Sequence, residues 1–171
     1  MTQHHRHVLA IDIALSTGWA HSNGQYGAWC LVSMATRFAT IRQKIHQAAE
    51  SFGLDLIAYE QADMGSPSMR QKADHNRTLG VVLLCAQELG VDTVGYHPTT
   101  IKCWFTGDGR ADKAQMVRAC RTHLGIELTL AEHDVADALA ILHMALQGVE
   151  PPQKKPRKQK AHATAKPRRL F

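Results

Sequence analysis

Residues 7–14 have the sequence HVLAIDIA, a short and mostly apolar run that is typical of a buried strand. One charged residue, Asp12, interrupts this run between Ile11 and Ile13. Because side chains alternate along a strand, Asp12 points to the opposite face of the sheet from its two neighbours. An unpaired buried charge costs several kcal/mol, so we expect a metal ion or a cationic group beside Asp12.

The sequence that follows this strand predicts an α/β fold. Two more strands are expected at residues 17–22 and 26–32, joined by the turn residues Asn23 and Gly24. Further along we expect a helix at 35–52, a strand at 54–60, a helix at 69–89, a strand at 91–96 and helical structure after that, broken at Gly107-Asp108-Gly109. Three antiparallel strands followed by alternating strands and helices indicate a mixed five-stranded sheet with helices on both faces.

Three further carboxylates stand where a ligand site can form. Glu60 ends the strand LDLIAYE, at the carboxyl edge where open α/β sheets bind ligands. Asp134 and Asp137 are three residues apart in the helical stretch EHDVADALAIL and share one face of that helix. A different face is apolar and can pack on the sheet, through Val135, Leu139, Leu142 and Leu146. Taken singly, each acid also has a structural explanation: a turn cap, a lysine partner or a helix cap.

Taken together, four carboxylates on three separate elements predict a site for divalent metal ions. Hard oxygen ligands of this kind suit Mg²⁺ or Mn²⁺ and do not suit zinc. Two ions in such a site position a water and stabilise the leaving oxygen during phosphodiester hydrolysis. We therefore expect two Mg²⁺ ions per site, with Mn²⁺ able to substitute for them.

The net charge is unevenly distributed along the chain. The whole chain carries +5, whereas residues 151–171 contain eight lysines and arginines and no acid, so residues 1–150 carry −3. The prolines of this basic segment keep it extended. It is either a solubilising tail or a sequence-independent arm that binds phosphates. We divide the chain into a polar extension at 1–7, a folded domain at 8–149 and a disordered basic tail at 150–171.

Composition excludes several other classes of protein. No apolar run reaches the roughly 18–20 residues that cross a bilayer, and the polar amino terminus does not resemble a signal peptide. The four cysteines lack the paired spacing of a zinc site: Cys30, Cys85, Cys103 and Cys120. We therefore expect free thiols in a reducing cytoplasm and no membrane partner.

The motifs of this chain resemble those of the RuvC Holliday-junction resolvases, which are RNase H-like nucleases. The resemblance is carried by LAID at 9–12, TGWA at 17–20, AYE at 58–60 and HDVADALA at 133–140. The segments HPTTIK at 97–102 and TGDGRADK at 106–113 look like the family's P-x-x-x-K…TG-x-G-x-A-x-K stretch. The similarity spans about residues 8–147, with every motif in the expected order.

This resemblance implies a structure-selective endonuclease that nicks four-way junctions or related branched DNA in recombination and repair, leaving a 5′-phosphate and a 3′-hydroxyl. It implies that the metal ligands are Asp12, Glu60, Asp134 and Asp137. Lys102 and Lys113 would act at the scissile phosphate, offsetting negative charge in the transition state, although each is alternatively a solvated surface lysine. The expected DNA-binding residues are Lys102, Gly107, Gly109, Arg110, Lys113, Lys154, Lys155, Arg157 and Lys158. The helix at 69–89 is either the contact of a homodimer or an ordinary packing helix.

The chain departs from the bacterial pattern in two places. The loop after Asp12 is shorter and leads to Thr17-Gly18-Trp19-Ala20, a form similar to RuvC-like nucleases of phages, so the host is a bacterium or a phage-infected cell. Bacterial RuvC has an aromatic residue three positions after the second carboxylate, where this chain has Asp63. Junction opening by stacking therefore does not carry over, and flaps or forks become alternative substrates. Asp63 is either a further metal ligand or a solvated loop acid.

Several residues and functions keep two interpretations. His133 is either a general base or a group that supports a metal ligand. Three aromatic residues stack on bases or pack in the core: Trp29, Trp104 and Phe105. Three histidines near the start bind metal or belong to an unstructured terminus: His4, His5 and His7. Two alternative functions stay open. One is a non-catalytic protein that binds branched DNA; the complete carboxylate set argues against it, because acids repel phosphates. The other is an actin-like ATPase, which needs glycine-rich phosphate-binding loops that are not evident in this sequence.

Overall fold

A computed structural model of the chain describes residues 7–31, 33, 35–61 and 69–151. Five strands form one sheet in the order β3-β2-β1-β4-β5. The strands are β1 (Val8–Asp12), β2 (Ser16–His21), β3 (Tyr26–Cys30), β4 (Leu56–Glu60) and β5 (Asp92–Tyr96). β1 pairs antiparallel with β2 and parallel with β4, β2 pairs antiparallel with β3, and β4 pairs parallel with β5. The mixed five-stranded sheet expected from the sequence is confirmed.

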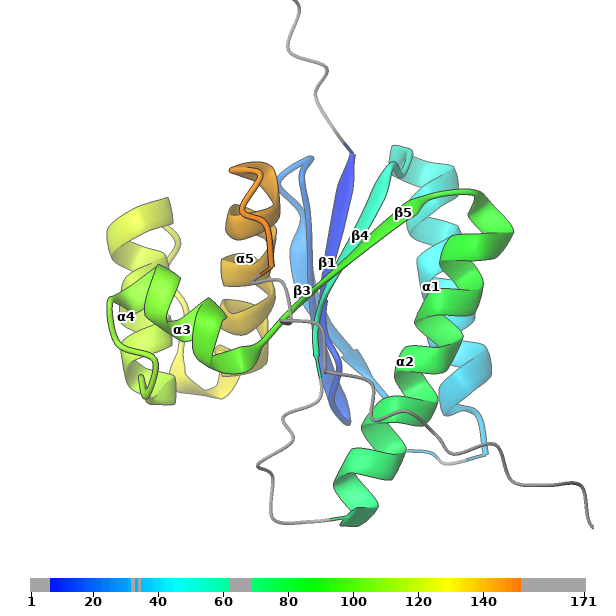
Figure 1. The fold of residues 1–171 in the computed structure, drawn as a ribbon, viewed down its shortest axis with the longest axis horizontal. Coiled ribbons are helices and arrows are strands. Elements are labelled where there is room, and N and C mark those ends of the chain that lie inside the picture. The colour runs from blue at the N-terminus through cyan, green and yellow to red at the C-terminus, as the bar shows by residue number, and fades with distance from the viewer. Residues whose placement is uncertain (1–6, 32, 34, 62–68, 152–171) are drawn as a thin grey trace, which may run out of the picture.

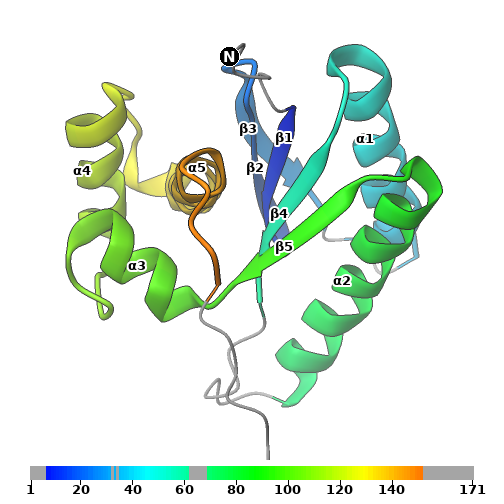
Figure 2. The same cartoon turned by 45° about the horizontal axis from the view of Figure 1, so that its top comes forward.

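Helices cover both faces of this sheet. They are α1 (Arg37–Phe52), α2 (Met69–Leu89), α3 (Pro98–Thr106), α4 (Lys113–Leu124), the 3₁₀ turn η1 (Leu130–Glu132) and α5 (His133–Leu146). Figures 1 and 2 show α1 and α2 on one face and α5 on the other, with α3 and α4 on the far side of α5. No helix in the described part of the chain is long and apolar enough to span a bilayer.

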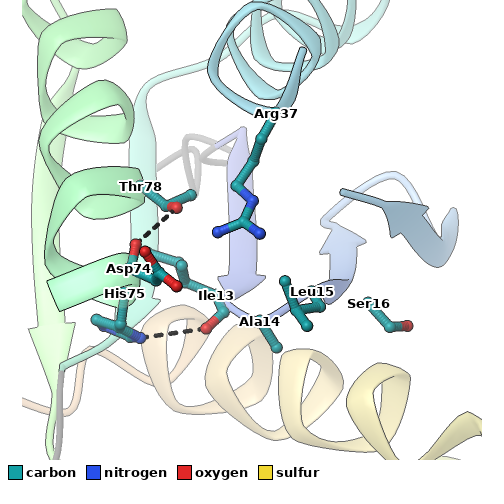
Figure 3. A pocket seen from close by; sticks show the side chains of 8 residues that line it. All are labelled: Ile13, Ala14, Leu15, Ser16, Arg37, Asp74, His75 and Thr78. Carbon is teal, nitrogen blue, oxygen red and sulfur yellow. Dashed lines mark hydrogen bonds between the residues drawn. The ribbon is translucent and has the colours of Figure 1, made fainter. Parts of the chain in front are cut away.

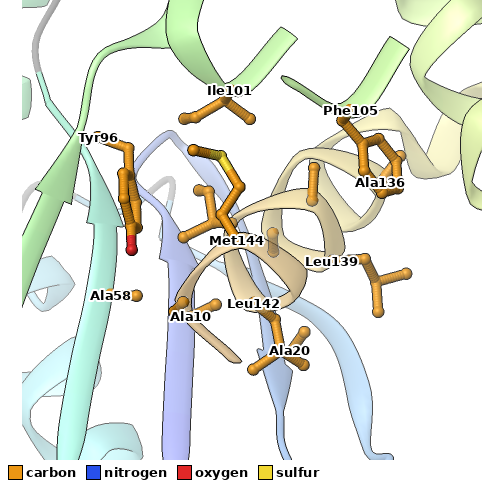
Figure 4. Packing of buried hydrophobic residues seen from close by; sticks show 14 of the residues in the cluster. Ala10, Ala20, Ala58, Tyr96, Ile101, Phe105, Ala136, Leu139, Leu142 and Met144 are labelled. Atoms are coloured by element: carbon orange, nitrogen blue, oxygen red, sulfur yellow. The ribbon is translucent and has the colours of Figure 1, made fainter. Parts of the chain in front are cut away.

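The core under α5 is built from small residues that let this helix lie close to the sheet (Figure 4). The sheet contributes three alanines to this contact, Ala10 on β1, Ala20 on β2 and Ala58 on β4. Leu139 and Leu142 pack in this cluster as expected, whereas Leu146 is 49% exposed because it lies at the end of the helix. Close packing on the sheet fixes the position of the first turn of α5, which carries two of the four carboxylates.

The predicted elements agree with the structure except at their ends and in one connection. Residues 125–129 were expected to be helical, but α4 ends at Gly125, whose φ of 68° is left-handed and stops the helix. Phe105 is 2% exposed and Trp29, which stacks on Trp19 with ring centroids 5.6 Å apart, is 8% exposed, so both belong to the core. Trp104 is 40% exposed and remains available to a ligand.

Candidate active site

Two of the predicted metal ligands lie at the carboxyl ends of adjacent parallel strands. Asp12 is the last residue of β1 and Glu60 is the last residue of β4. The register pairs Ile11 with Tyr59, so the next residue of each strand reaches the same edge of the sheet. Asp12 is only 9% exposed, since it lies under α5 with the alanine cluster. This edge is where open α/β sheets bind their ligands.

A glycine brings the first turn of α5 against this edge. Gly18 on β2 pairs with Asp12, and a β-carbon at Gly18 would lie 1.9 Å from the main-chain oxygen of Asp134. Only a residue without a side chain permits this approach of the two backbones. The Thr17-Gly18 motif therefore serves to place Asp134 and Asp137 beside Asp12.

The electrostatics of the four carboxylates show that they are close together. Burial raises the pKa of Asp12 well above its usual value, and the charges of Glu60, Asp137 and Asp134 raise it further. Burial likewise raises the pKa of Asp137 to about 6, and the charge of Asp134 adds to this effect. These carboxylates form a group of like charges, with Asp12 buried and the other three partly buried, that a cation would stabilise. We call them the carboxylate cluster.

Both predicted lysines act on the carboxylate cluster. Lys102, on α3, lowers the pKa of Asp137, and Lys113, at the start of α4, lowers the pKa values of Asp12 and Asp137. The structure thus brings together all six residues that the sequence assigns to catalysis, from β1, β4, α3, α4 and α5.

His133 connects a lysine to the carboxylate cluster. Its Nε2 contacts the Nζ atom of Lys113, and its Nδ1 lies 2.7 Å from a carboxylate oxygen of Asp134. An ammonium group can only donate, so Nε2 accepts from Lys113, whereas Nδ1 is buried and makes no hydrogen bond with the residues described. His133 therefore lies between Lys113 and Asp134, and its role as a general base or as a supporting group stays a prediction.

The sequence of this chain is similar to those of a known protein family. The family model described as "Crossover junction endodeoxyribonuclease RuvC" matches residues 31–144. The chain belongs to the RuvC family. A RuvC protein of Rhodopirellula baltica is 32% identical over 146 residues, which cover 78% of this chain and 82% of the relative. A RuvC protein of Gloeobacter violaceus is 37% identical over 105 residues, covering 61% of this chain and only 60% of the relative.

Solved RuvC structures confirm the RNase H-like architecture. Thermus thermophilus RuvC in complex with a Holliday junction substrate superposes with a TM-score of 0.69 at 23% identity, over 87% of this chain and 100% of that chain. The yeast mitochondrial Holliday junction resolvase superposes with a TM-score of 0.59 at 12% identity, over 84% and 78%. At these identities the likeness concerns the fold.

The match to the RuvC family model leaves one predicted ligand outside it. Glu60, Asp134 and Asp137 lie within the matched residues, whereas Asp12 precedes residue 31. The placement of Asp12 in the site consequently depends on the structure, through its pairing with β2 and β4 and its electrostatic contact with the other acids. The phage-like character of the loop after Asp12 stays a prediction.

The fold explains both glycines in the segment between α3 and α4. Gly107 has a φ of 83° and ends α3, its N–H donating to the carbonyl of Cys103. A β-carbon at Gly109 would lie 2.7 Å from the side chain of Thr99. Arg110 is exposed beside them, and the DNA-binding role of all three residues stays a prediction. Four predicted DNA-binding residues lie outside the described residues: Lys154, Lys155, Arg157 and Lys158. His4, His5 and Asp63 also lie outside them.

The donor set fits hard divalent cations, in keeping with a family of metal-dependent nucleases. All four predicted ligands are carboxylates, two of which have pKa values raised by burial and by their neighbours. No three of these four carboxylates have ligand atoms within 4.8 Å of one another.

Another group of possible ligands lies on the opposite face of the sheet. His46, Cys85 and Glu88 have ligand atoms within 4.8 Å of one another. Glu88 already accepts two hydrogen bonds from Nε and Nη2 of Arg42, at 3.0 and 3.1 Å. A cation at this place would have to displace the guanidinium, so the carboxylate cluster is the better metal site.

The raised pKa of Asp137 predicts that acid stabilises the metal-free protein. Its pKa is 3.8 in a model peptide and about 6 in the fold. Between these values the folded state holds a proton that the unfolded state has lost, so stability decreases as the pH rises through this window. We expect the thermal unfolding midpoint in EDTA to increase by a few degrees when the pH falls from about 7.5 to about 5.

The variant Asp137→Asn isolates this effect from the other acids. Burial lowers the pKa values of His75 and His143, and hydrogen bonds lower those of Glu88 and Glu132. All four groups therefore destabilise the fold in acid and act in the opposite direction. The difference in midpoint between wild type and Asp137→Asn should therefore shrink as the pH falls. Adding Mg²⁺ at about pH 7.5 should raise the wild-type midpoint more than that of the variant. A difference independent of pH would contradict the raised pKa.

Proposed function

We propose that this RuvC-family chain is a metal-dependent endonuclease that nicks four-way junctions or related branched DNA. The observation that carries the proposal is the convergence of four carboxylates and two lysines at one edge of the sheet. A protein that only binds DNA gains nothing from buried carboxylates, since they repel phosphates. The relatives are named as crossover junction endodeoxyribonucleases, and one solved neighbour was determined with a Holliday junction substrate.

The metal site consists of Asp12, Glu60, Asp134 and Asp137. Two Mg²⁺ ions, or Mn²⁺ in their place, supply activation of a water molecule and neutralisation of the leaving oxygen when they are bound. The chain's own residues hold these carboxylates in position: Gly18 admits the first turn of α5, and the alanine cluster fixes its distance from β1. The product ends are a 5′-phosphate and a 3′-hydroxyl.

The lysines bind and orient the phosphate that is cut. Lys102 and Lys113 approach the carboxylate cluster from α3 and α4, and their ammonium groups offset charge that develops on the phosphate oxygens. His133 accepts from Lys113 and so keeps its ammonium group directed at the cluster.

Two copies of the chain, in contact through α2, would present two such sites to a two-fold symmetric junction. We place this activity in the cytoplasm of a bacterium or a phage-infected cell.

A cleavage assay with matched substrates tests the proposed function. An end-labelled four-way junction is incubated with the protein and Mg²⁺, beside flap, fork and linear duplex substrates and a lane with EDTA. We expect paired nicks on the junction that EDTA abolishes and that Glu60→Gln loses while still binding. The control Glu50→Gln changes an exposed glutamate of α1 and should cut as wild type does. Binding without any metal-dependent cut would overturn the proposal, and equal cutting of all branched forms would remove the junction preference.

Removing the basic tail should weaken DNA binding in a salt-dependent way. Residues 151–171 carry eight cations and no acid. Each phosphate that is neutralised releases counterions, so the slope of log K against log salt reports the number of contacts. We expect a chain ending at residue 150 to bind a junction roughly 10-fold or more weakly at low salt, with a shallower slope. Equal slopes for the two chains in a salt titration would show that the tail only solubilises the protein.

A further inference from the structure

A cavity of about 420 Å³ lies at the edge of the sheet where β1 ends (Figure 3). It is lined by the loop after β1, by the first residue of α1 and by α2: Ile13, Ala14, Leu15, Ser16, Arg37, Asp74, His75 and Thr78. The loop begins one residue after Asp12, and consecutive α-carbons are about 3.8 Å apart. Ile13 belongs to the core cluster under α1 and α2, so the cavity opens on the other face of the sheet from α5. We call it the α1–α2 cavity.

A buried arginine points its guanidinium into this cavity. Arg37 is 5% exposed, and its Nε donates to the carbonyl of Leu31 at 2.9 Å, which fixes the orientation of the guanidinium plane. Figure 3 shows the two terminal nitrogens directed at the space between α2 and the loop after β1. Within the described ranges these two nitrogens have no hydrogen-bond or ion-pair partner. Because its terminal nitrogens face the cavity, the guanidinium can donate to a ligand that offers acceptors.

The wall opposite Arg37 supplies acceptors. The side chain of Asp74 lies on this wall, and its Oδ1 accepts a hydrogen bond from Arg77 at 3.1 Å. His75 is adjacent, with Nδ1 3.1 Å from the carbonyl of Ile13, and its Nε2 is buried without a partner among the residues described. Ile13 and Leu15 add apolar surface between the two walls. The α1–α2 cavity thus offers donors on one side, acceptors on the other and an apolar floor.

A nucleobase matches this distribution of groups better than a phosphate does. A phosphate only accepts hydrogen bonds and would be repelled by the carboxylate of Asp74. The edge of guanine has acceptors at O6 and N7, which arginine binds in a bidentate manner, and donors at N1 and N2, which a carboxylate can accept. The volume lies within the range of about 300–1,000 Å³ that is usual for small-molecule sites. Enzymes that act on DNA do extrude single bases, and this is least costly for unpaired ones.

We propose that the α1–α2 cavity binds a guanine base unstacked from the DNA beside the phosphodiester that is cut, with Arg37 donating to O6 and N7 and Asp74 accepting from N1 and N2. This inference rests on the proposed function, since it needs branched DNA at the carboxylate cluster. It assigns a base-reading role to residues of α1 and α2, outside the metal ligands and the lysines.

Atom-level changes to the base test the two contacts separately. Junctions carry guanine or an abasic site at each of the two nucleotides on either side of the cut, and equilibrium binding is measured with Ca²⁺ in place of Mg²⁺. At the position read by the cavity, guanine should bind roughly 10-fold more tightly than the abasic site. There 7-deazaguanine, which lacks N7, and hypoxanthine, which lacks the 2-amino group, should each lose several-fold in affinity.

Matched variants assign each loss to a side chain. Arg37→Met should remove the difference between guanine and 7-deazaguanine, and Asp74→Asn should change the difference between guanine and hypoxanthine. Arg42→Met alters an exposed arginine of the same helix and should keep both differences. A thermal unfolding midpoint for each variant separates loss of recognition from loss of the fold, and Asp74→Asn preserves the shape of the cavity if Arg37→Met does not fold.

The outcomes separate this inference from the proposed function. Affinities of guanine, its analogues and the abasic site within about twofold at every position would overturn the base pocket. A uniform weakening of all junctions by Arg37→Met, reproduced by one neutral methylphosphonate linkage, would overturn it in favour of a phosphate site. Junctions cut without base preference likewise overturn only the inference. Junctions bound with the expected preference but never cut with Mg²⁺ support the pocket and overturn the proposed function.

Discussion

The variant Asp12→Asn should lose DNA cleavage and at the same time become more stable in the absence of metal. Removal of one carboxylate ligand is expected to lower the rate of junction cutting on the order of 10³-fold. The asparagine relieves the burial of a charge and its repulsion by Glu60, Asp137 and Asp134, which together raise the pKa of Asp12. We therefore expect the thermal unfolding midpoint in EDTA at about pH 8 to increase by a few degrees.

The two opposite effects distinguish a functional carboxylate from a structural one. Glu50→Gln is the control, because Glu50 is an exposed glutamate of α1. It should change neither the cleavage rate nor the midpoint appreciably. A loss of stability in Asp12→Asn would indicate that the acid stabilises a turn, and retained cleavage would remove Asp12 from the set of metal ligands.

The variant Gly18→Ala should have a much lower free energy of unfolding than the wild type. Its β-carbon would lie 1.9 Å from the carbonyl oxygen and 2.3 Å from the carbonyl carbon of Asp134. Both are backbone atoms, so α5 has to move away from the sheet and its alanine contacts open. We expect a loss of about 3 kcal/mol in the free energy of unfolding, measured by urea titration.

The matched control for Gly18→Ala is Gly80→Ala. Gly80 lies within α2, and no atom lies within 4 Å of a β-carbon placed there. Alanine is favoured over glycine in a helix by about 1 kcal/mol, so this variant should be slightly more stable. The residual folded Gly18→Ala protein should also cut DNA poorly, because Asp134 and Asp137 are displaced from Asp12. Equal stability of the two variants would show that α5 does not rest on β2 as described.

The sequence alone predicts those parts of the site that follow from strand periodicity and helix spacing. Asp12 and Glu60 were predicted because an acid in or at the end of an apolar strand is conspicuous, and Asp134 and Asp137 because they share a helix face. Their convergence depends on β1 pairing in parallel with β4 and on the contact of Gly18 with α5. These are long-range contacts that no local pattern reports.

Arg37 could not be predicted as a functional residue from the sequence. An arginine at the start of a helix usually extends into solvent, and only the carbonyl of Leu31 and the packing of α1 on α2 bury this one. The α1–α2 cavity likewise joins the loop after β1 to α2 through the contact of His75 with Ile13. In the sequence these segments are separated by two strands, a helix and another strand.

The order of the elements also determines when the carboxylate cluster can exist during synthesis. β1 and β2 form a hairpin early, but Asp134 and Asp137 belong to α5, the last element of the folded domain. Because contacts between residues far apart in sequence form late, a ribosome-bound chain has the DNA-facing edge of the sheet before it has all four acids. A nascent or truncated chain that lacks α5 therefore lacks two of the four predicted metal ligands.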